Sequence, residues 1–404
     1  MIRKQGIIMK KKVRNLSALV VAGLTLYATN GFSIPAIEMD YTCPIGKEKF
    51  RSIDYSPQCP TNKFVMFKNE FTKEELEKYE KIINSKEYKA VPKTSPKEYY
   101  LGRFYEMAGG FSDKEIGETY YKAYRAQINW NSENTNILKE SLTKGISYLE
   151  KSLPMENKSE FPWSLAYLYI SNKEFDKANA LVEKQDKNIH LERIANFYYS
   201  VSDVEKSKEN YYGYDYMDFD KESIDKKTKK EFREKALYYL QAVIKKNKGH
   251  YSEKELFRLV DLYKSLGNEK AIDEVFSKAP SEYWSSIVSY YLDEPIGSIG
   301  DVYDGKKLAT EDNLKKALSY ADKLVKMISK NNSADKIQYN LSIILKAEAE
   351  RRLGKFEEAS KTLNKINIMD IKDTIYRYDF ERLKELTEKK DSSVREYTPL
   401  PIMY

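Results

Sequence analysis

Histidine, the side chain that most often serves as a general base near neutral pH, occurs only twice, as His190 and His250. Neither lies in an H-E-x-x-H pattern, and the sequence has no G-x-S-x-G, Walker-type or G-x-G-x-x-G stretch. His190 precedes a helix expected to begin at Leu191, and His250 follows the end of another, where histidine commonly meets the helix dipole or solvent. No motif pairs a nucleophile with a base. We therefore predict that the protein is not an enzyme and uses no metal or other cofactor.

Paired carboxylates are the catalytic possibility that the composition leaves open. The chain has 62 Asp and Glu residues, and an all-helical protein can place two acids across a cleft, as glycoside hydrolysis requires. Because these acids are interspersed with lysines, as on solvated helix faces, the sequence selects no particular pair. A hydrolase that acts on envelope glycans is therefore the alternative to a binding protein.

Two long connections between expected helices carry residues suited to binding. The first, 211–220, alternates aromatic and acidic residues, as partner-binding surfaces often do, although its acids lack EF-hand spacing. Its candidate partner-binding residues are Tyr211, Tyr212, Tyr214, Tyr216 and Phe219. Packing of these rings on the helices is the alternative. The second connection, 293–304, is longer than most helix–helix loops, and such loops tend to be functional or disordered.

The two cysteines each begin a Cys-Pro pair within residues 34–70, a segment unlike the rest of the chain. We expect two short strands or knuckles here, each opened by Cys-Pro. The layout resembles a zinc ribbon built from Cys-Pro-x-Cys knuckles, as in uncharacterised bacterial proteins that join such a head to tetratricopeptide-like helices. Gly46 and Asn62 stand where each knuckle would have its second cysteine, so Cys43 and Cys59 supply only two of the four ligands that structural zinc takes.

A disulfide between Cys43 and Cys59 is the interpretation that we favour. The two residues lie 16 apart, and an oxidising compartment would favour their pairing. Closing a loop of that length contributes about 3 kcal/mol, which a small head with little core would need. Free structural thiols and a metal site are the alternatives.

The N-terminus indicates the compartment. Six Lys and Arg residues, without an acid, precede an uncharged and mostly apolar stretch, 16–28, that is too short to span a bilayer. We therefore predict a cleavable signal peptide, residues 1–33, that starts at Met1 or Met9 and directs the protein to the periplasm or the medium; an uncleaved anchor is the alternative. Removing these six charges from the net +7 leaves about +1, which argues against nucleic acid as a partner. Beyond residue 40 we expect no membrane span.

Residues 71–390 show the apolar periodicity of paired helices. In the clearest pair, 336–366, a tight turn is followed by Gly354, Phe356 and Ala359 at spacings that resemble a tetratricopeptide repeat. Such a unit cannot bury its apolar face alone, so the resemblance implies stacked neighbours. The alanines expected at close helix contacts are separated by 35 to 58 residues, not by the 34 of a regular array; they are Ala123, Ala178, Ala236, Ala271, Ala317 and Ala359.

The expected fold is therefore all-α: an irregular tetratricopeptide-like α-solenoid with a small N-terminal Cys-Pro knuckle and strand segment, followed by a flexible tail, 391–404. Five tyrosine doublets lie on its helices, and they suit interhelix packing or a peptide-binding groove. We expect an exported scaffold of the bacterial envelope that binds a protein or peptide partner. The sequence identifies neither the partner nor the oligomeric state.

Overall fold

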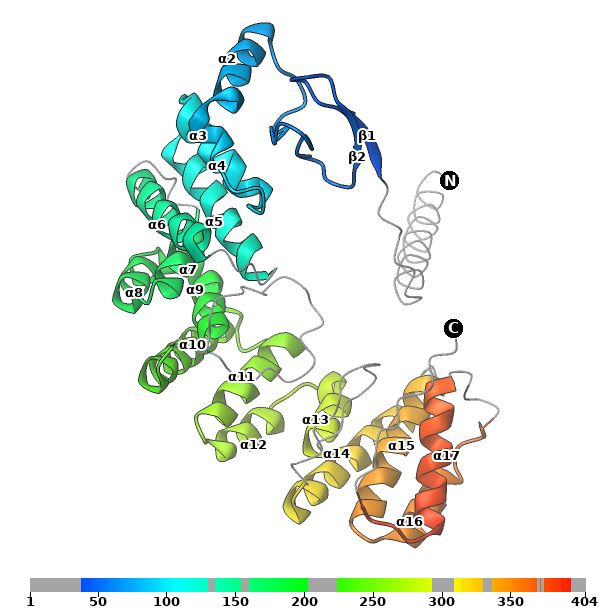
Figure 1. The fold of residues 1–404 in the computed structure, drawn as a ribbon. Coiled ribbons are helices and arrows are strands. Elements are labelled where there is room, and N and C mark those ends of the chain that lie inside the picture. Colours follow the sequence, from blue (N-terminus) through cyan, green and yellow to red (C-terminus); the bar gives the residue numbers. More distant parts are fainter. Residues whose placement is uncertain are drawn as a thin grey trace, which may run out of the picture. The chain divides into compact units, whose positions relative to one another are not determined.

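The computed structural model describes residues 38–129, 135–153, 160–202, 224–292, 309–329, 336–368, 371 and 374–393. Within these ranges the chain is mostly helical, with 16 α-helices and one two-stranded sheet (Figure 1). It divides into two compact units, Met1–Ser152 and Leu153–Tyr404. The predicted signal peptide, the connection 293–304 and the tail from residue 394 lie outside the described residues.

The sequence predicts no membrane span beyond residue 40, and the described helices can be compared with that prediction. Among the residues that the structure describes, no helix is both long enough and apolar enough to cross a bilayer.

The head of the first unit is a small antiparallel sheet with two knuckles. Strand β1 (Met39–Thr42) pairs with β2 (Lys49–Ser52), and the Cys43-Pro44 knuckle lies between them. Cys-Pro therefore opens each knuckle, which is one of the two predicted alternatives, and it opens neither strand. Proline has no backbone N–H for the ladder, so β1 ends just before this knuckle. The second knuckle forms only an isolated bridge, between Gln58 and Val65.

The helices of the first unit begin at local signals that the sequence shows. Thr72 caps α2 through a capping box with Glu75, and the Ser112 hydroxyl accepts a hydrogen bond from the Glu115 amide at the start of α5. The helices are α2 (Lys73–Asn84), α3 (Lys86–Lys89), α4 (Lys97–Ala108), α5 (Asp113–Asn129) and α6 (Thr135–Ser152).

The head and the helices of the first unit share one core. Phe64 of the second knuckle is fully buried, and its ring lies 5.5 Å from Phe104 on α4 and 6.1 Å from Tyr79 on α2. Both cysteines belong to the same buried cluster. Because aromatic rings bury large areas, this contact ties the head to the helices that follow it.

The second unit consists of successive helices, most of which pack on the next one along the chain (Figure 1). The helices are α7 (Trp163–Ser171), α8 (Phe175–Glu183), α9 (Lys187–Val201), α10 (Lys226–Lys246), α11 (Glu253–Ser265), α12 (Glu269–Ser277), the 3₁₀ turn η3 (Ser281–Tyr283), α13 (Trp284–Leu292), α14 (Glu311–Ser329), α15 (Lys336–Arg352), α16 (Phe356–Leu363) and α17 (Thr374–Glu388). The predicted pair 336–366 corresponds to α15–α16, and α7–α8 and α11–α12 form two similar helix pairs.

These three pairs turn in the same way. The turn residue has a positive φ in each: 61° at Lys173, 72° at Gly267 and 75° at Gly354. The next amide donates to a carbonyl five residues upstream, over 2.8 to 2.9 Å. Glycine adopts this left-handed conformation readily, whereas Lys173 adopts it at some cost. The first pair thus keeps the turn without the glycine that the sequence lacks there.

Most of the alanines expected at close helix contacts lie there. Ala123, Ala178, Ala236, Ala317 and Ala359 are fully buried. The prediction for Ala271 is wrong, because the neighbouring Ile272 takes the inward position on α12 and Ala271 stays partly exposed.

Candidate functional site

The structure contains the predicted disulfide. Cys43 and Cys59 are bonded, with their Cα atoms 5.7 Å apart, and both are buried. The two knuckles have matching backbones: each cysteine amide donates to the carbonyl five residues later, at 2.7 Å (Glu48) and 2.8 Å (Phe64). The free-thiol and metal alternatives are therefore wrong for this pair.

The two positions without cysteine lie beside the disulfide. The side-chain amide of Asn62 donates to the Ile45 carbonyl at 2.9 Å and lies 3.5 Å from the Cys43 sulfur. A Cβ atom added at Gly46 would lie 3.7 Å from the same amide nitrogen. The four knuckle positions therefore converge, with a disulfide and an amide where a zinc ribbon has four thiolates.

The predicted partner-binding residues cannot be placed. Tyr211, Tyr212, Tyr214, Tyr216 and Phe219 lie outside the described residues, so their role stays a prediction.

Three polar clusters, which we call acid–tyrosine clusters, recur on the helices and were missed from the sequence. In the first, Glu106 on α4 accepts hydrogen bonds from the Tyr120 hydroxyl on α5 at 2.8 Å and from Lys144 on α6 at 2.7 Å. Tyr148, one turn beyond Lys144, donates to the other Glu106 oxygen at 3.0 Å. One carboxylate thus joins three helices of the first unit.

The second cluster has the same composition in the second unit. Glu183 on α8 accepts from the Tyr198 hydroxyl on α9 at 3.0 Å. It also accepts hydrogen bonds from two residues of α10, Lys235 at 2.9 Å and Tyr239 at 2.5 Å. Asn179, one turn before Glu183, also accepts from Tyr198, at 2.6 Å. Each of the three helices contributes at least one polar side chain to the cluster.

The third cluster repeats the pattern with an aspartate. Asp273 on α12 accepts from the Tyr291 hydroxyl on α13 at 2.6 Å and from Lys316 on α14 at 2.8 Å. Tyr320, one turn beyond Lys316, stacks on Tyr291 with their centroids 6.1 Å apart. The corresponding tyrosines also stack in the other two clusters, with ring centroids 6.3 Å apart for Tyr120 and Tyr148 and 5.6 Å apart for Tyr198 and Tyr239.

The lysine of each cluster lies over the ring of the first tyrosine. Its Nζ is 5.2 Å from the ring centroid in the first cluster, 5.1 Å in the second and 5.6 Å in the third. At these distances the ring quadrupole attracts the ammonium group. The tyrosine rings are mostly buried, while the lysine and carboxylate stay partly exposed. Each cluster therefore presents an ion pair at the surface above stacked rings.

The electrostatics of the second cluster keep its carboxylate ionised. Burial raises the pKa of Glu183, but hydrogen bonds from Tyr239, Lys235 and Tyr198 outweigh it and lower the pKa to about 2. Burial and the neighbouring carboxylate raise the pKa of Tyr198, and they act likewise on the first tyrosine of the other two clusters. The tyrosines are thus neutral donors to an ionised acceptor.

The signal that identifies these clusters is a short pattern on one helix of each. Lysine is followed by a small residue, Ile or Leu, any residue and tyrosine, at 144–148, 235–239 and 316–320. Lysine and tyrosine four residues apart lie on the same helix face, so both can reach one carboxylate. The tyrosine doublets mostly pack between helices, and among them Tyr238 alone is an exposed member, beside Tyr239 of the second cluster.

The histidines lie away from these clusters. His190 lies inside the first turn of α9, not before a helix as predicted, and it is buried with its ring 5.7 Å from Phe161. The helix begins earlier because Asp186 caps it by accepting from the Asn188 amide. His250 is exposed at the end of a turn that follows α10.

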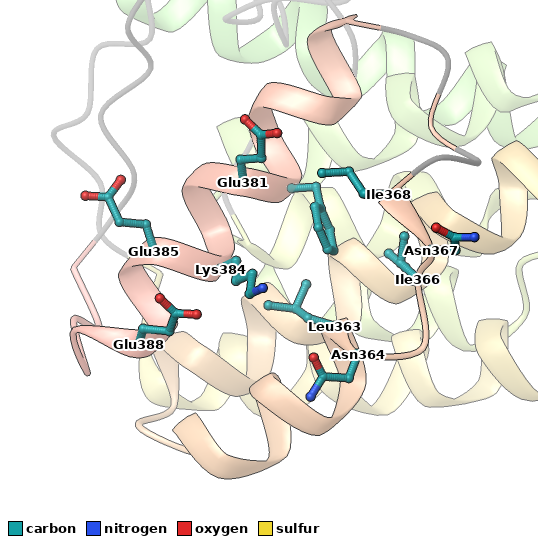
Figure 2. Close-up of a pocket in the computed structure, with 10 residues that line it drawn as sticks. Leu363, Asn364, Ile366, Asn367, Ile368, Glu381, Lys384, Glu385 and Glu388 are labelled. Carbon is teal, nitrogen blue, oxygen red and sulfur yellow. The ribbon is translucent and has the colours of Figure 1, made fainter.

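A hollow of about 490 Å³ lies between α16, the segment that follows it, and α17 (Figure 2). Its lining includes the apolar residues Leu363, Ile366, Ile368 and Phe380 and the polar residues Asn364, Asn367, Glu381, Lys384, Glu385 and Glu388. Within the part of the chain that the structure describes, no group of three or more His, Cys, Asp and Glu side chains is placed to hold a metal ion.

Comparison with known proteins adds no relative. No family model, curated protein or solved structure matches the chain.

Proposed function

We propose that this protein is an exported, irregular tetratricopeptide-like α-solenoid that binds a protein or peptide partner of the bacterial envelope and does not catalyse a reaction. The observation that carries the proposal is the recurrence of the acid–tyrosine cluster. The cluster lysines, Lys144, Lys235 and Lys316, are separated by 91 and 81 residues. A unit of several helices that recurs along the chain is typical of helical-repeat scaffolds.

The clusters also favour binding because of the surface that they present. An extended polypeptide offers carbonyl, amide and charged groups at intervals, and repeated ion pairs above aromatic rings can engage such a ligand at several points. Tyrosine is enriched where protein interfaces concentrate their binding energy. The exposed Tyr238, whose ring lies 5.1 Å from Tyr239, adds an accessible aromatic surface beside the second cluster.

The hydrolase alternative receives less support from the same residues. A general acid in glycoside hydrolysis needs a carboxyl group that stays protonated near neutral pH, and thus a raised pKa. The pKa of Glu183 is instead lowered to about 2, and that of Glu140, which accepts from Tyr99 beside the first cluster, is also lowered. Carboxylates held in this way suit ion pairing.

Export is supported by the disulfide. Structural disulfides persist in oxidising compartments and are rare in the cytosol of most organisms. The Cys43–Cys59 bond lies inside the core that joins the head to the helices, so reduction would affect the packing of the first unit. The predicted signal peptide, 1–33, agrees with this location.

Site-specific photo-crosslinking tests the binding function. A photoreactive phenylalanine derivative would replace Tyr238 in the full chain expressed in a bacterial host, with the same replacement at Tyr55 as the control. Both tyrosines are exposed, 65% and 91%, but Tyr55 belongs to the head and contributes to none of the acid–tyrosine clusters. We expect a discrete adduct from position 238 and none of that mass from position 55. Identical adduct patterns, or none from position 238, would contradict the proposal.

A further inference from the structure

The hollow between α16 and α17 combines an apolar floor with an acidic rim. Leu363 and Phe380 are buried residues of its lining, and Glu381 and Glu388 are exposed residues of α17, which Figure 2 labels. Neither glutamate has an ion-pair partner among the described residues, whereas Glu385 pairs with Arg382 at 2.8 Å. Lys384 is the one cation of the lining. The rim therefore has unneutralised negative charge.

The internal repeats show how α16 corresponds to α8 and α12. On α8, Asn179 and Glu183 lie six and ten residues after the positive-φ turn residue Lys173. On α12, Asp273 lies six residues after its turn residue, Gly267. These are the acceptors of the second and third clusters.

On α16 the same two positions also carry polar residues. Ser360 and Asn364 lie six and ten residues after the turn residue Gly354. Asn364 lines the hollow. The hollow thus borders the helix face on which the earlier repeats collect their hydrogen bonds.

In the earlier repeats a further helix covers this face. Helix α10 packs along α9 and reaches α8 through Lys235 and Tyr239. Helix α14 packs along α13 and reaches α12 through Lys316. The described helices that pack closely on α17, the counterpart of α9 and α13, are α15 and α16. Among the described residues, the place of α10 and α14 is therefore open at this last pair.

We infer that this hollow is the docking site for an amphipathic helix of a partner protein, which presents a lysine or arginine and, one turn later, an aromatic residue. Its cation would meet the acidic rim formed by Glu381 and Glu388, and its apolar face would cover Leu363 and Phe380, much as α10 and α14 cover the earlier repeats. Helix-in-groove recognition uses side chains at such spacings. The inference rests on the proposed binding function and adds the class of partner and a second surface.

Peptide binding to the full chain tests this docking site. The probe is a fluorescently labelled synthetic peptide with the sequence of residues 311–329, the protein's own example of the required helix. The control peptide carries the changes Lys316→Glu and Tyr320→Ala. We expect saturable binding of the first peptide by fluorescence anisotropy and at least tenfold weaker binding of the second, because a favourable charge contact and an aromatic anchor are both lost.

Protein variants assign the binding to the hollow. The double change Glu381→Lys and Glu388→Lys reverses the rim charge, and Glu357→Lys with Glu358→Lys makes the same change at exposed positions of α16 outside the lining. All four glutamates are exposed, so both variants are expected to fold, which circular dichroism checks. We expect the rim variant to weaken peptide binding at least tenfold and the control variant to leave it within twofold.

Three results would overturn the inference. The first is no saturable binding of the peptide by the wild-type chain, and the second is equal binding by the rim variant. The third is a concentration-dependent dimer, lost in the rim variant on sedimentation, which would assign the hollow to a second copy of the chain. If any of these results occurs while the crosslink from position 238 persists in the wild-type chain, this docking site has failed and the proposed function stands.

Discussion

Removing the negative charge of Glu183 tests whether the second cluster stabilises the fold as its geometry implies. The change Glu183→Gln keeps a carbonyl acceptor of similar shape on α8. It weakens the charge-assisted hydrogen bonds from Lys235 at 2.9 Å and from the Tyr198 and Tyr239 hydroxyls. Position 183 would then offer α9 and α10 only a neutral acceptor, while the contacts of Asn179 and the packing of Phe175 on Phe232 remain.

The expected loss follows from the difference between charged and neutral hydrogen bonds. A bond to a charged group contributes about 1.5–3 kcal/mol and a neutral one about 0.5–1.5 kcal/mol. Glu183 and Lys235 are 31% and 33% exposed, so solvent screens part of that difference. We therefore expect Glu183→Gln to lower the free energy of unfolding by about 1–2 kcal/mol at pH 7.

The pH dependence gives this prediction its distinctive signature. Because the pKa of Glu183 is about 2 in the folded protein and 4.5 for an unperturbed glutamate, the carboxylate stabilises the fold fully above about pH 5. That contribution is lost as the pH falls toward 2. Glutamine does not titrate, so the difference between wild type and variant should shrink over the same interval.

Amide hydrogen exchange of α8, α9 and α10 is the measurement of choice, because the chain has two units and global unfolding need not be two-state. The matched control is Glu231→Gln on α10, whose carboxylate is exposed and lies 3.9 Å from Lys227; its exchange should equal that of wild type. Unchanged exchange in Glu183→Gln at pH 7, or a difference that stays constant down to pH 2, would refute the reasoning.

Three further changes test other parts of the molecule. Cys59→Ser, which opens the disulfide, should lower the free energy of unfolding of the first unit by about 3 kcal/mol, and a reducing agent should lower the melting temperature of wild type but not of the variant. Gly117→Ala places a Cβ 2.7 Å from Leu149 on α6, so urea denaturation should show a loss of about 1–3 kcal/mol, and an unchanged midpoint would contradict this close approach. Arg351→Met leaves Glu348 buried without its 2.7 Å partner, and thermal unfolding should report a loss of about 3–5 kcal/mol; equal stability would show that Glu348 is neutral in the fold.

Helix positions were predictable where the signal was local. The helix pair predicted at 336–366 corresponds to α15 and α16, and the capping box of α2 uses Thr72 and Glu75, whose spacing is visible in the sequence. The start of α9 was placed four residues late, because Asp186 caps through its own side chain without the glutamate that completes a capping box. Local chemistry thus identifies most helices and leaves some of their ends uncertain.

The candidate site was less predictable because its residues come from three helices. Tyr198 and Lys235 are 37 residues apart in the sequence and meet only through the packing of α9 on α10. A single sequence shows which residues share one helix face, but it does not show which carboxylate of a neighbouring helix they reach. The pattern of lysine and tyrosine was therefore visible, while Glu183 as its acceptor was not.

The irregular spacing of the alanines is explained by the length of the repeat, which contains four helices. Ala178, Ile272 and Ala359 take the same place in α8, α12 and α16, five residues after the positive-φ turn residue, and they are separated by 94 and 87 residues. A search at the 34-residue period of tetratricopeptide repeats compares helices that are not equivalent, because the recurring unit contains four helices.

The four-helix repeat also shows that the two long connections noted in the sequence are equivalent. The segment 211–220 lies between α9 and α10, and the segment 293–304 lies between α13 and α14. The two segments occupy the same position in successive four-helix repeats. Each joins the helix that carries the first tyrosine of a cluster to the helix that carries its lysine. We expect a partner that engages the second cluster to use the tyrosine-rich segment 211–220 as well, so deleting 211–220 should weaken the crosslink from position 238.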